Sequence, residues 1–304
     1  MKKSRRHTLK LLSLFPFIPS SISESSLNSY NTSQDIIRKP KLSLNLYSFN
    51  DQLQSGVLQL EDVITYCAKQ GYSAIDPTAY YFPGYPDVPR DEYLYDFKLK
   101  VFNAGLEISG TGIRNNFSDP DHKKRQQDIQ LIENWAIASE KMGIPVMRIF
   151  AGSPINEIDQ KKRAFNWMID DFKRCADIGS DHGVIIALQN HNEFIKNSDE
   201  IIEIIEKVNS PWFRIHLDIG SFRDKNVYQE IEKVIQYAVN WQIKEQIYID
   251  GIAVTPDYVK ILQIVKDHHY VGYLPLETLG PGDPIEKLKI LKQKVTEAFE
   301  KVFS

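Results

Sequence analysis

Apolar and polar segments alternate along most of the chain. Short apolar runs, each of about four to eight residues, are typical of strands buried on both faces. Longer segments between them repeat apolar residues at helical spacing. The pattern predicts eight strands, at 42–49, 72–75, 106–113, 146–150, 184–188, 213–217, 239–243 and 273–276.

A helix is predicted after each of these strands. Gly105 and Gly143 follow two of the periodic segments and are typical helix stops. Eight alternating strand and helix signals favour a single (β/α)₈ TIM barrel of the α/β class, over residues 41–304, rather than an open doubly wound sheet. The predicted helices cover 60–70, 91–104, 123–142, 156–178, 199–208, 227–237, 256–268 and 284–302.

The first residues have the pattern of an export signal instead. Residues 1–23 combine a basic head, a short apolar core at 11–18 and a small-x-small cleavage pattern at 21–23. The segment from Ser4 to Lys10 resembles a twin-arginine motif, and an ordinary secretory signal is the alternative. Residues 24–40 are rich in serine and asparagine and predict a flexible leader. We therefore expect an exported, periplasmic protein.

Charge and composition exclude several classes of partner. Removing the five positive residues of 1–23 changes the formal charge from -3 to -8, which disfavours binding to nucleic acid. No later apolar run reaches the roughly 18 residues of a membrane span, so no membrane contact is expected in the mature form. Cys67 and Cys175 form no metal-binding or disulfide pattern. A homo-oligomer is left open.

Polar side chains stand at the ends of the four later strands. They are Gln189, Asp218, Gln242 and Glu277. Because the carboxyl ends of parallel strands meet at one rim of a barrel, we expect these side chains to converge. Carboxylate and amide oxygens suit divalent ions, so the sequence predicts a Mn, Mg or Co site. Taken singly, Gln189 is also consistent with a loop residue and Asp218 with a turn cap.

These strand ends resemble the sugar phosphate isomerase/epimerase family of xylose isomerase-like TIM barrels over about residues 41–300. Leu188-Gln-Asn-His191 is similar to the family's Leu-Glu-Asn-His, and Leu217-Asp-Ile-Gly-Ser221 to its Asp-x-Gly-His. Gln242-Ile-Lys-Glu245 resembles its His-x-Lys-Asp, and Gly272-Tyr-Leu-Pro-Leu-Glu277 its Gly-Tyr-x-Gly-Leu-Glu variants. The resemblance implies metal ligands at the four strand ends and sugar contacts near His191 and Lys244.

The chain departs from the family pattern at three of these positions. Gln189 stands where well-studied epimerases have a glutamate that is both ligand and base, and an amide cannot take a proton. Gln242 and Ser221 each replace a histidine. Glu277 remains as one base. We therefore expect weaker metal binding and a reaction that needs a single base.

Other candidate substrate contacts lie at the earlier strand ends. Asp76 begins an aromatic-rich segment in which Tyr81 is positioned to stack on a sugar, although a packed loop fits equally well. Arg114 and Arg148 are candidates for binding a hydroxyl-rich or acidic substrate, or for structural salt bridges. His216 is expected to be a hydrogen-bonded core histidine. Asn190 and Ser221 complete the predicted substrate contacts.

The sequence thus predicts a metal-dependent isomerase or epimerase that moves a proton beside the carbonyl group of a sugar or keto-sugar. Glu277, Lys244 and His191 are its predicted catalytic residues. A lyase or hydratase acting on a 3-keto sugar is one alternative. A sugar-binding barrel without catalysis, owing to the loss of a base at Gln189, is another.

Overall fold

The computed structural model describes residues 39–304 apart from residue 192. The predicted export signal at 1–23 and nearly all of the leader at 24–40 lie outside the described residues. The described residues form one compact unit. None of the helices within the described part contains an apolar stretch of bilayer-spanning length.

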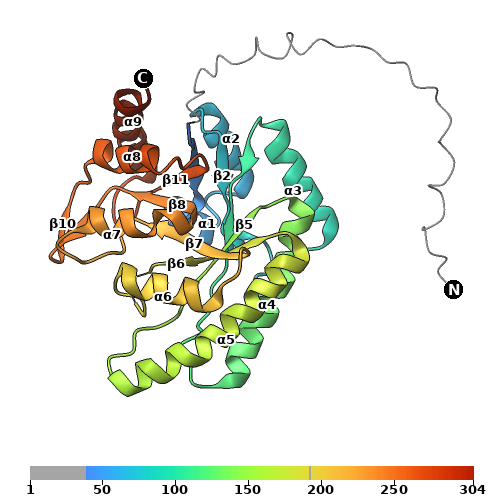
Figure 1. The fold of residues 1–304 in the computed structure, drawn as a ribbon. Coiled ribbons are helices and arrows are strands. Elements are labelled where there is room, and N and C mark those ends of the chain that lie inside the picture. Colours follow the sequence, from blue (N-terminus) through green and yellow to red (C-terminus); the bar gives the residue numbers. More distant parts are fainter. Residues whose placement is uncertain (1–38, 192) are drawn as a thin grey trace, which may run out of the picture. The chain divides into compact units, whose positions relative to one another are not determined.

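Parallel strands close into a barrel with helices packed outside it (Figure 1). The strand order is β3-β2-β1-β11-β8-β7-β6-β5-β4, and a bridge between Thr78 and Gly112 joins the two ends of the sheet. The predicted TIM barrel is therefore confirmed. The barrel strands are β1 (Lys41–Asn45), β2 (Ala74–Asp76), β3 (Glu107–Ile108), β4 (Thr111–Gly112), β5 (Val146–Ile149), β6 (Ile185–Gln189), β7 (Phe213–Asp218), β8 (Ala238–Lys244) and β11 (Tyr273–Glu277).

The third predicted strand is split into β3 and β4 because polar side chains fill the barrel interior at this level. A Cβ atom on Gly110 would lie 2.6 Å from the side-chain nitrogen of Asn240 and 3.1 Å from a carboxylate oxygen of Asp76. The hydroxyl oxygens of Ser43 and Ser109 lie 2.7 Å apart across the barrel. Only glycine leaves enough room here, so the backbone departs from regular strand geometry.

The helices follow the predicted segments with end shifts of a few residues, except α1, which was not predicted. Asp121, Asn197 and Asp283 each cap a helix through a side-chain oxygen that accepts a backbone N–H. The helices are α1 (Asn50–Gln54), α2 (Leu60–Lys69), α3 (Asp91–Asn103), α4 (His122–Met142), α5 (Ile158–His182), α6 (Ser198–Val208), α7 (Val227–Val234), α8 (Tyr258–Asp267) and α9 (Pro284–Phe303).

Successive side chains along each strand point to opposite faces, so apolar and polar side chains lie in separate layers. Leu188, Leu217 and Leu276 are at most 1% exposed and belong to the apolar core. The residues next to them, including Gln189 and Asp218, belong to the polar set at the strand ends. The two-residue period of a strand therefore places the polar side chains together.

A short antiparallel hairpin follows β8 and was missed in the sequence. Its strands are β9 (Ile247–Ile249) and β10 (Ile252–Val254). Asp250 and Gly251 connect them with φ values of 51° and 76°, as a tight hairpin turn requires. The Asp-Gly pair between two alternating segments was the available signal. The hairpin contributes to the wall of the candidate site described below.

Candidate active site at the carboxyl ends of the strands

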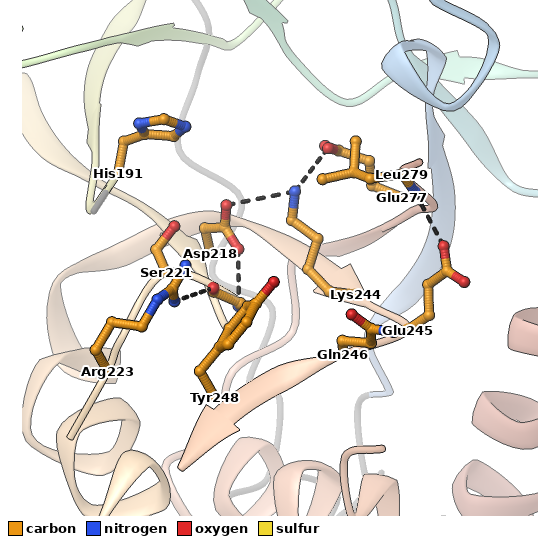
Figure 2. A pocket seen from close by; sticks show the side chains of 11 residues that line it. His191, Asp218, Ser221, Arg223, Lys244, Glu245, Gln246, Tyr248, Glu277 and Leu279 are labelled. Carbon is orange, nitrogen blue, oxygen red and sulfur yellow. Dashed lines mark hydrogen bonds and ion pairs between the residues drawn. The ribbon is translucent and has the colours of Figure 1, made fainter. Parts of the chain in front are cut away.

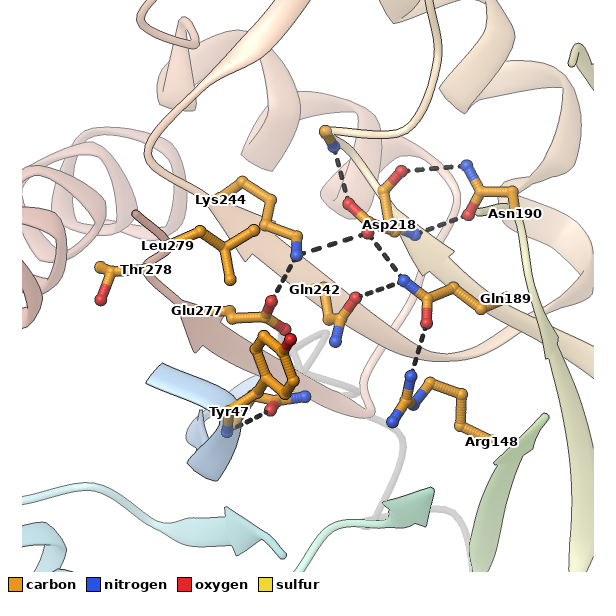
Figure 3. A network of polar contacts seen from close by, with 12 residues as sticks. Tyr47, Arg148, Gln189, Asn190, Asp218, Gln242, Lys244, Glu277, Thr278 and Leu279 are labelled. Atoms are coloured by element: carbon orange, nitrogen blue, oxygen red, sulfur yellow. Dashed lines mark hydrogen bonds and ion pairs between the residues drawn. The ribbon is translucent and has the colours of Figure 1, made fainter. Parts of the chain in front are cut away.

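The structure brings the four predicted strand-end side chains together. Gln189, at the end of β6, donates from its amide nitrogen to Asp218 Oδ2 at 2.8 Å and to Gln242 Oε1 at 2.7 Å (Figure 3). Glu277 joins the group through Lys244, as described next. All four side chains are buried, each residue being 3% exposed.

Lys244 supplies a positive charge between the two carboxylates. Its ammonium lies 2.6 Å from Glu277 Oε1 and 3.4 Å from Asp218 Oδ2 (Figure 3). Burial by itself lowers the pKa of Lys244, but the charges of Asp218 and Glu277 raise it above its ordinary value overall. The side chain is therefore a buried cation with two anionic partners.

Arg148, on β5, fixes the orientation of the Gln189 amide. Its guanidinium donates to Gln189 Oε1 at 2.8 Å and lies 4.7 Å from the centre of the Phe150 ring. With this oxygen facing Arg148, the amide nitrogen faces Asp218. A flipped amide would bring its NH₂ group against the guanidinium, so the observed orientation is strongly favoured.

Asn190 holds the backbone of Asp218 in place. Its side-chain nitrogen donates to the Asp218 carbonyl oxygen at 2.9 Å, and its side-chain oxygen accepts the Asp218 N–H at 2.7 Å. Asp218 Oδ1 accepts the N–H of Gly220 at 2.8 Å. Asn190 was predicted to bind substrate; in the structure its side chain bonds the backbone of Asp218.

A cavity of about 240 Å³ opens beside this network, with His191, Asp218, Ser221, Lys244 and Glu277 on its wall (Figure 2). Several other wall residues were not predicted from the sequence, and two of them, from the loop after β7 and from the hairpin, stack on each other. These are Arg223 and Tyr248, stacked with the guanidinium carbon 3.7 Å from the ring centre.

Glu277 has one oxygen available for chemistry. Its Oε1 accepts a hydrogen bond from Lys244, whereas its buried Oε2 has no hydrogen-bond partner among the described residues. A buried carboxylate oxygen without a donor is costly, and such groups occur where a ligand or a proton is to be received. The free oxygen belongs to a residue on the cavity wall.

Five of the six predicted substrate contacts do not line this cavity, and two of these five, Arg148 and Asn190, belong to the network described above. Asp76 lies in the barrel interior and accepts a hydrogen bond from Asn240 at 3.0 Å; burial raises its pKa to about 6, which Arg148 and Asn240 partly oppose. Tyr81 donates its hydroxyl to Asn50 at 3.0 Å. Arg114 stacks on Tyr80 at 4.5 Å and borders a separate surface hollow.

His191 and His216 differ in their surroundings. His191 lines the cavity, with its ring edge-on to Phe150 at 5.3 Å between centres. His216 is fully buried, and neither of its ring nitrogens has a hydrogen-bond partner among the described residues, so the prediction of a hydrogen-bonded core histidine was wrong. Burial, together with nearby Arg148 and Lys244, lowers the pKa of His216 far below its usual range, which leaves it neutral.

The predicted ligands do not present a set of oxygens suited to a divalent ion. The Gln189 oxygen faces Arg148, and the Gln242 oxygen accepts from Gln189. Both Asp218 oxygens are engaged, which leaves Glu277 Oε2. Within residues 39–304, residue 192 excepted, no cluster of three or more His, Cys, Asp or Glu side chains is placed to hold a metal. A divalent ion needs several oxygens directed at one point, so the arrangement does not fit.

Solved structures share this fold. D-psicose 3-epimerase from Clostridium cellulolyticum H10, crystallised with D-tagatose, superposes with a TM-score of 0.70 at 17% identity, over 86% of this chain and 98% of that one. The IolI protein, crystallised with a bound zinc atom, gives 0.69 at 17% identity, over 87% and 99%. At such identities the likeness concerns the fold alone.

Sequence comparisons point to the same group of proteins. The 3'-dehydrocarminate deglycosidase alpha subunit of Microbacterium sp. is 27% identical over 122 residues, which are 36% of this chain and 32% of that protein. The match thus spans about a third of that relative's length. Residues 64–294 match the model of the xylose isomerase-like TIM barrel family. On this match and the barrel itself, the chain belongs to the xylose isomerase-like TIM barrels.

Proposed function

We propose that this protein is an enzyme that transfers a proton at the carbon next to the carbonyl group of a sugar or keto-sugar, as a sugar isomerase or epimerase does. One observation carries the proposal. Glu277 is a residue of the wall of a polar cavity, and its carboxylate has one oxygen bound to an ammonium group and a second, buried oxygen without a partner among the described residues. This arrangement is suited to a general base.

Lys244 is placed to stabilise the charge that such a transfer creates. Removing a proton beside a carbonyl group moves negative charge onto the carbonyl oxygen. The Lys244 ammonium lies 2.6 Å from Glu277 Oε1, so a carbonyl oxygen at the ammonium brings the neighbouring carbon within reach of Glu277. A preorganised cation in a buried site stabilises the enediolate more strongly than water does.

The described site supports a reaction with one base. Gln189 cannot accept a proton, and the Asp218 oxygens already accept from Gly220, Gln189 and Lys244. Glu277 can move a proton between neighbouring carbons on one face of the substrate, which is an isomerisation. An epimerisation that delivers the proton to the opposite face needs a second donor, for which His191 on the cavity wall is the candidate.

Elimination from a 3-keto sugar is the second candidate. The same abstraction beside a ketone, followed by departure of the substituent on the next carbon, cleaves a glycosidic bond. The named relative is a deglycosidase whose substrate name denotes an oxidised sugar, which favours this reaction. It requires one base and an oxyanion stabiliser, the roles that we propose for Glu277 and Lys244.

A panel of ketohexoses, aldoses and 3-keto glycosides, incubated with the protein in D₂O and followed by NMR, tests the proposal. We expect deuterium to enter the carbon beside the carbonyl group of at least one sugar. A new isomer identifies an isomerase or epimerase, and a released aglycone identifies a lyase. Tight binding without deuterium uptake would instead identify a sugar-binding barrel without catalysis.

A further inference from the structure

We propose that the ammonium group of Lys244 is the resident cation of this site, taking the place that a divalent metal ion would occupy between Asp218 and Glu277. The catalytic role of this cation rests on the proposed function. The exclusion of a metal ion stands on the geometry of the side chains.

The order of the strands explains how a lysine reaches this position. β8 lies between β7 and β11 in the sheet, and these neighbours carry Asp218 and Glu277 at their ends. Lys244 is the last residue of β8 and pairs in register with Glu277. Its side chain therefore enters the space between the two carboxylates, at 3.4 Å and 2.6 Å from their oxygens.

Charge balance opposes the addition of a divalent ion. The ammonium of Lys244 already lies between the carboxylates of Asp218 and Glu277. The buried guanidinium of Arg148 adds a second positive charge, which also faces Asp76. His216, in the layer below, is neutral. An ion bound to the same carboxylate oxygens would lie within about 4–5 Å of the ammonium, where like charges in a buried site repel each other strongly.

The orientation of the amides reinforces the exclusion. Arg148 holds the Gln189 oxygen at 2.8 Å, and the amide nitrogen points to Asp218 and Gln242. The network thus presents N–H donors where a metal ion requires oxygen atoms. Among the described residues, the side chains of this network bind one another without a metal ion, with Glu277 Oε2 as the exception.

The ammonium also retains a donor for the substrate. A lysine has three N–H donors, and the structure gives the Lys244 ammonium two acceptors, on Glu277 and Asp218. The third donor is available to a substrate oxygen in the cavity that Lys244 lines. A lysine can thus perform the charge stabilisation for which a Lewis acid is otherwise used.

Metal binding tests this inference without any substrate. Mn²⁺ is titrated into the full chain and followed by electron paramagnetic resonance, with thermal melting in parallel. We compare the wild type with Lys244→Met, with Gln189→Glu, with the double variant, and with Gln246→Glu. The last is a matched control that adds a carboxylate to the cavity wall outside the network.

We expect the wild type and Gln246→Glu to bind no Mn²⁺ stoichiometrically. The double variant removes a positive charge and adds a negative one, so it should bind Mn²⁺ at least about a hundredfold more tightly than the wild type. Lys244→Met leaves two carboxylates unbalanced; its melting temperature should fall and recover when Mn²⁺ is added. Gln189→Glu alone should bind Mn²⁺ less tightly than the double variant.

Stoichiometric, tight Mn²⁺ binding by the wild type would overturn the inference. So would a folded double variant that binds Mn²⁺ no better than the wild type, because Lys244 and Gln189 would then not be what excludes the ion. Neither result depends on turnover. A wild type that binds no metal and exchanges no proton would contradict the proposed function while leaving the exclusion of the metal intact.

Discussion

Glu277 and Lys244 form a hydrogen-bonded ion pair, and each affects the charge and the orientation of the other. The ammonium donates to one carboxylate oxygen of Glu277, whereas the second oxygen has no hydrogen-bond partner among the described residues. Asp218 shares the ammonium at 3.4 Å and is itself held by Asn190 and Gly220. On the proposed function, Glu277 is the reactive carboxylate of the site and Asp218 the structural one.

Replacement of Glu277 by glutamine tests the base. We expect the rate of deuterium transfer to fall at least about a thousandfold, because a general base of this kind contributes up to about four orders of magnitude. The matched control is Glu107→Gln at the opposite end of the barrel, where Glu107 pairs with Lys41. The control should keep the normal rate; a normal rate in Glu277→Gln would remove Glu277 from the mechanism.

The raised pKa of Asp76 leads us to expect that the free energy of unfolding depends on pH. Burial raises its pKa from 3.8 to about 6. Between about pH 4 and 6 the folded protein therefore binds more protons at Asp76 than the unfolded chain does. The contribution of protonated Asp76 to the free energy of unfolding is complete below about pH 4 and is lost as the pH rises through about 6. Asp76→Asn removes the charged form, so the variant should gain stability relative to the wild type as the pH rises.

Urea unfolding at pH 4 and pH 8 measures this effect. The difference in unfolding free energy, variant minus wild type, should be about 2–3 kcal/mol larger at pH 8 than at pH 4. An equal difference at both pH values would show that Asp76 has the same pKa in the folded and unfolded states.

The sequence predicted which polar residues meet, but not how they pair. Gln189, Asp218 and Glu277 end buried strands, and strand ends of a parallel barrel share one rim, so their convergence was predictable. The direction of the Gln189 amide depends on Arg148, which comes from another strand. The position of the long Lys244 side chain depends on both carboxylates, of Asp218 and Glu277. No local sequence pattern indicates which of two such partners a lysine will contact.

At the scale of elements, the hairpin of β9 and β10 contributes to the wall of the candidate cavity. Tyr248 on β9 lines the cavity and stacks with Arg223 from the loop after β7. The sequence analysis missed the hairpin because three-residue strands carry too little periodic signal. Asp250 and Gly251 were the one feature from which the turn could have been predicted.

Truncation of Tyr248 tests this role. Tyr248→Ala removes an aromatic surface from the cavity wall and a partner of Arg223, so we expect KM for the sugar to rise about tenfold with a smaller change in kcat. Ile252→Ala is the matched control, since Ile252 lies on the second strand of the same hairpin and is 67% exposed. Steady-state kinetics measure both variants; an unchanged KM for Tyr248→Ala would place substrate elsewhere.

At the scale of the whole molecule, the eightfold alternation of apolar runs and helical segments was enough to predict the barrel. The split of the third strand was not predictable, because Gly110 responds to Asn240 and Asp76, which are far from it in sequence. The sequence gives strands and helices through local periodicity. Contacts across the barrel interior join residues that are far apart in the sequence, and no local pattern indicates which of them meet.

Export remains a prediction at this scale, because residues 1–23 lie outside the described part of the chain. Replacing Arg5 and Arg6 by lysines keeps the charge but removes the arginine pair of the motif. We expect the variant to accumulate in the cytoplasm with its signal uncleaved, as seen by fractionation and mass spectrometry of the N-terminus. Unchanged export would favour the ordinary secretory signal.

Proton exchange by metal-free protein tests whether Glu277 and Lys244 perform the reaction without a metal ion. The wild type is freed of metal with a chelator and incubated, with the chelator present, with its keto-sugar in D₂O, and deuterium at the carbon beside the carbonyl group is followed by NMR. The account predicts the same exchange rate with and without the chelator, and its loss in Glu277→Gln. Exchange that stops in the chelator and returns on addition of a divalent metal would contradict the account.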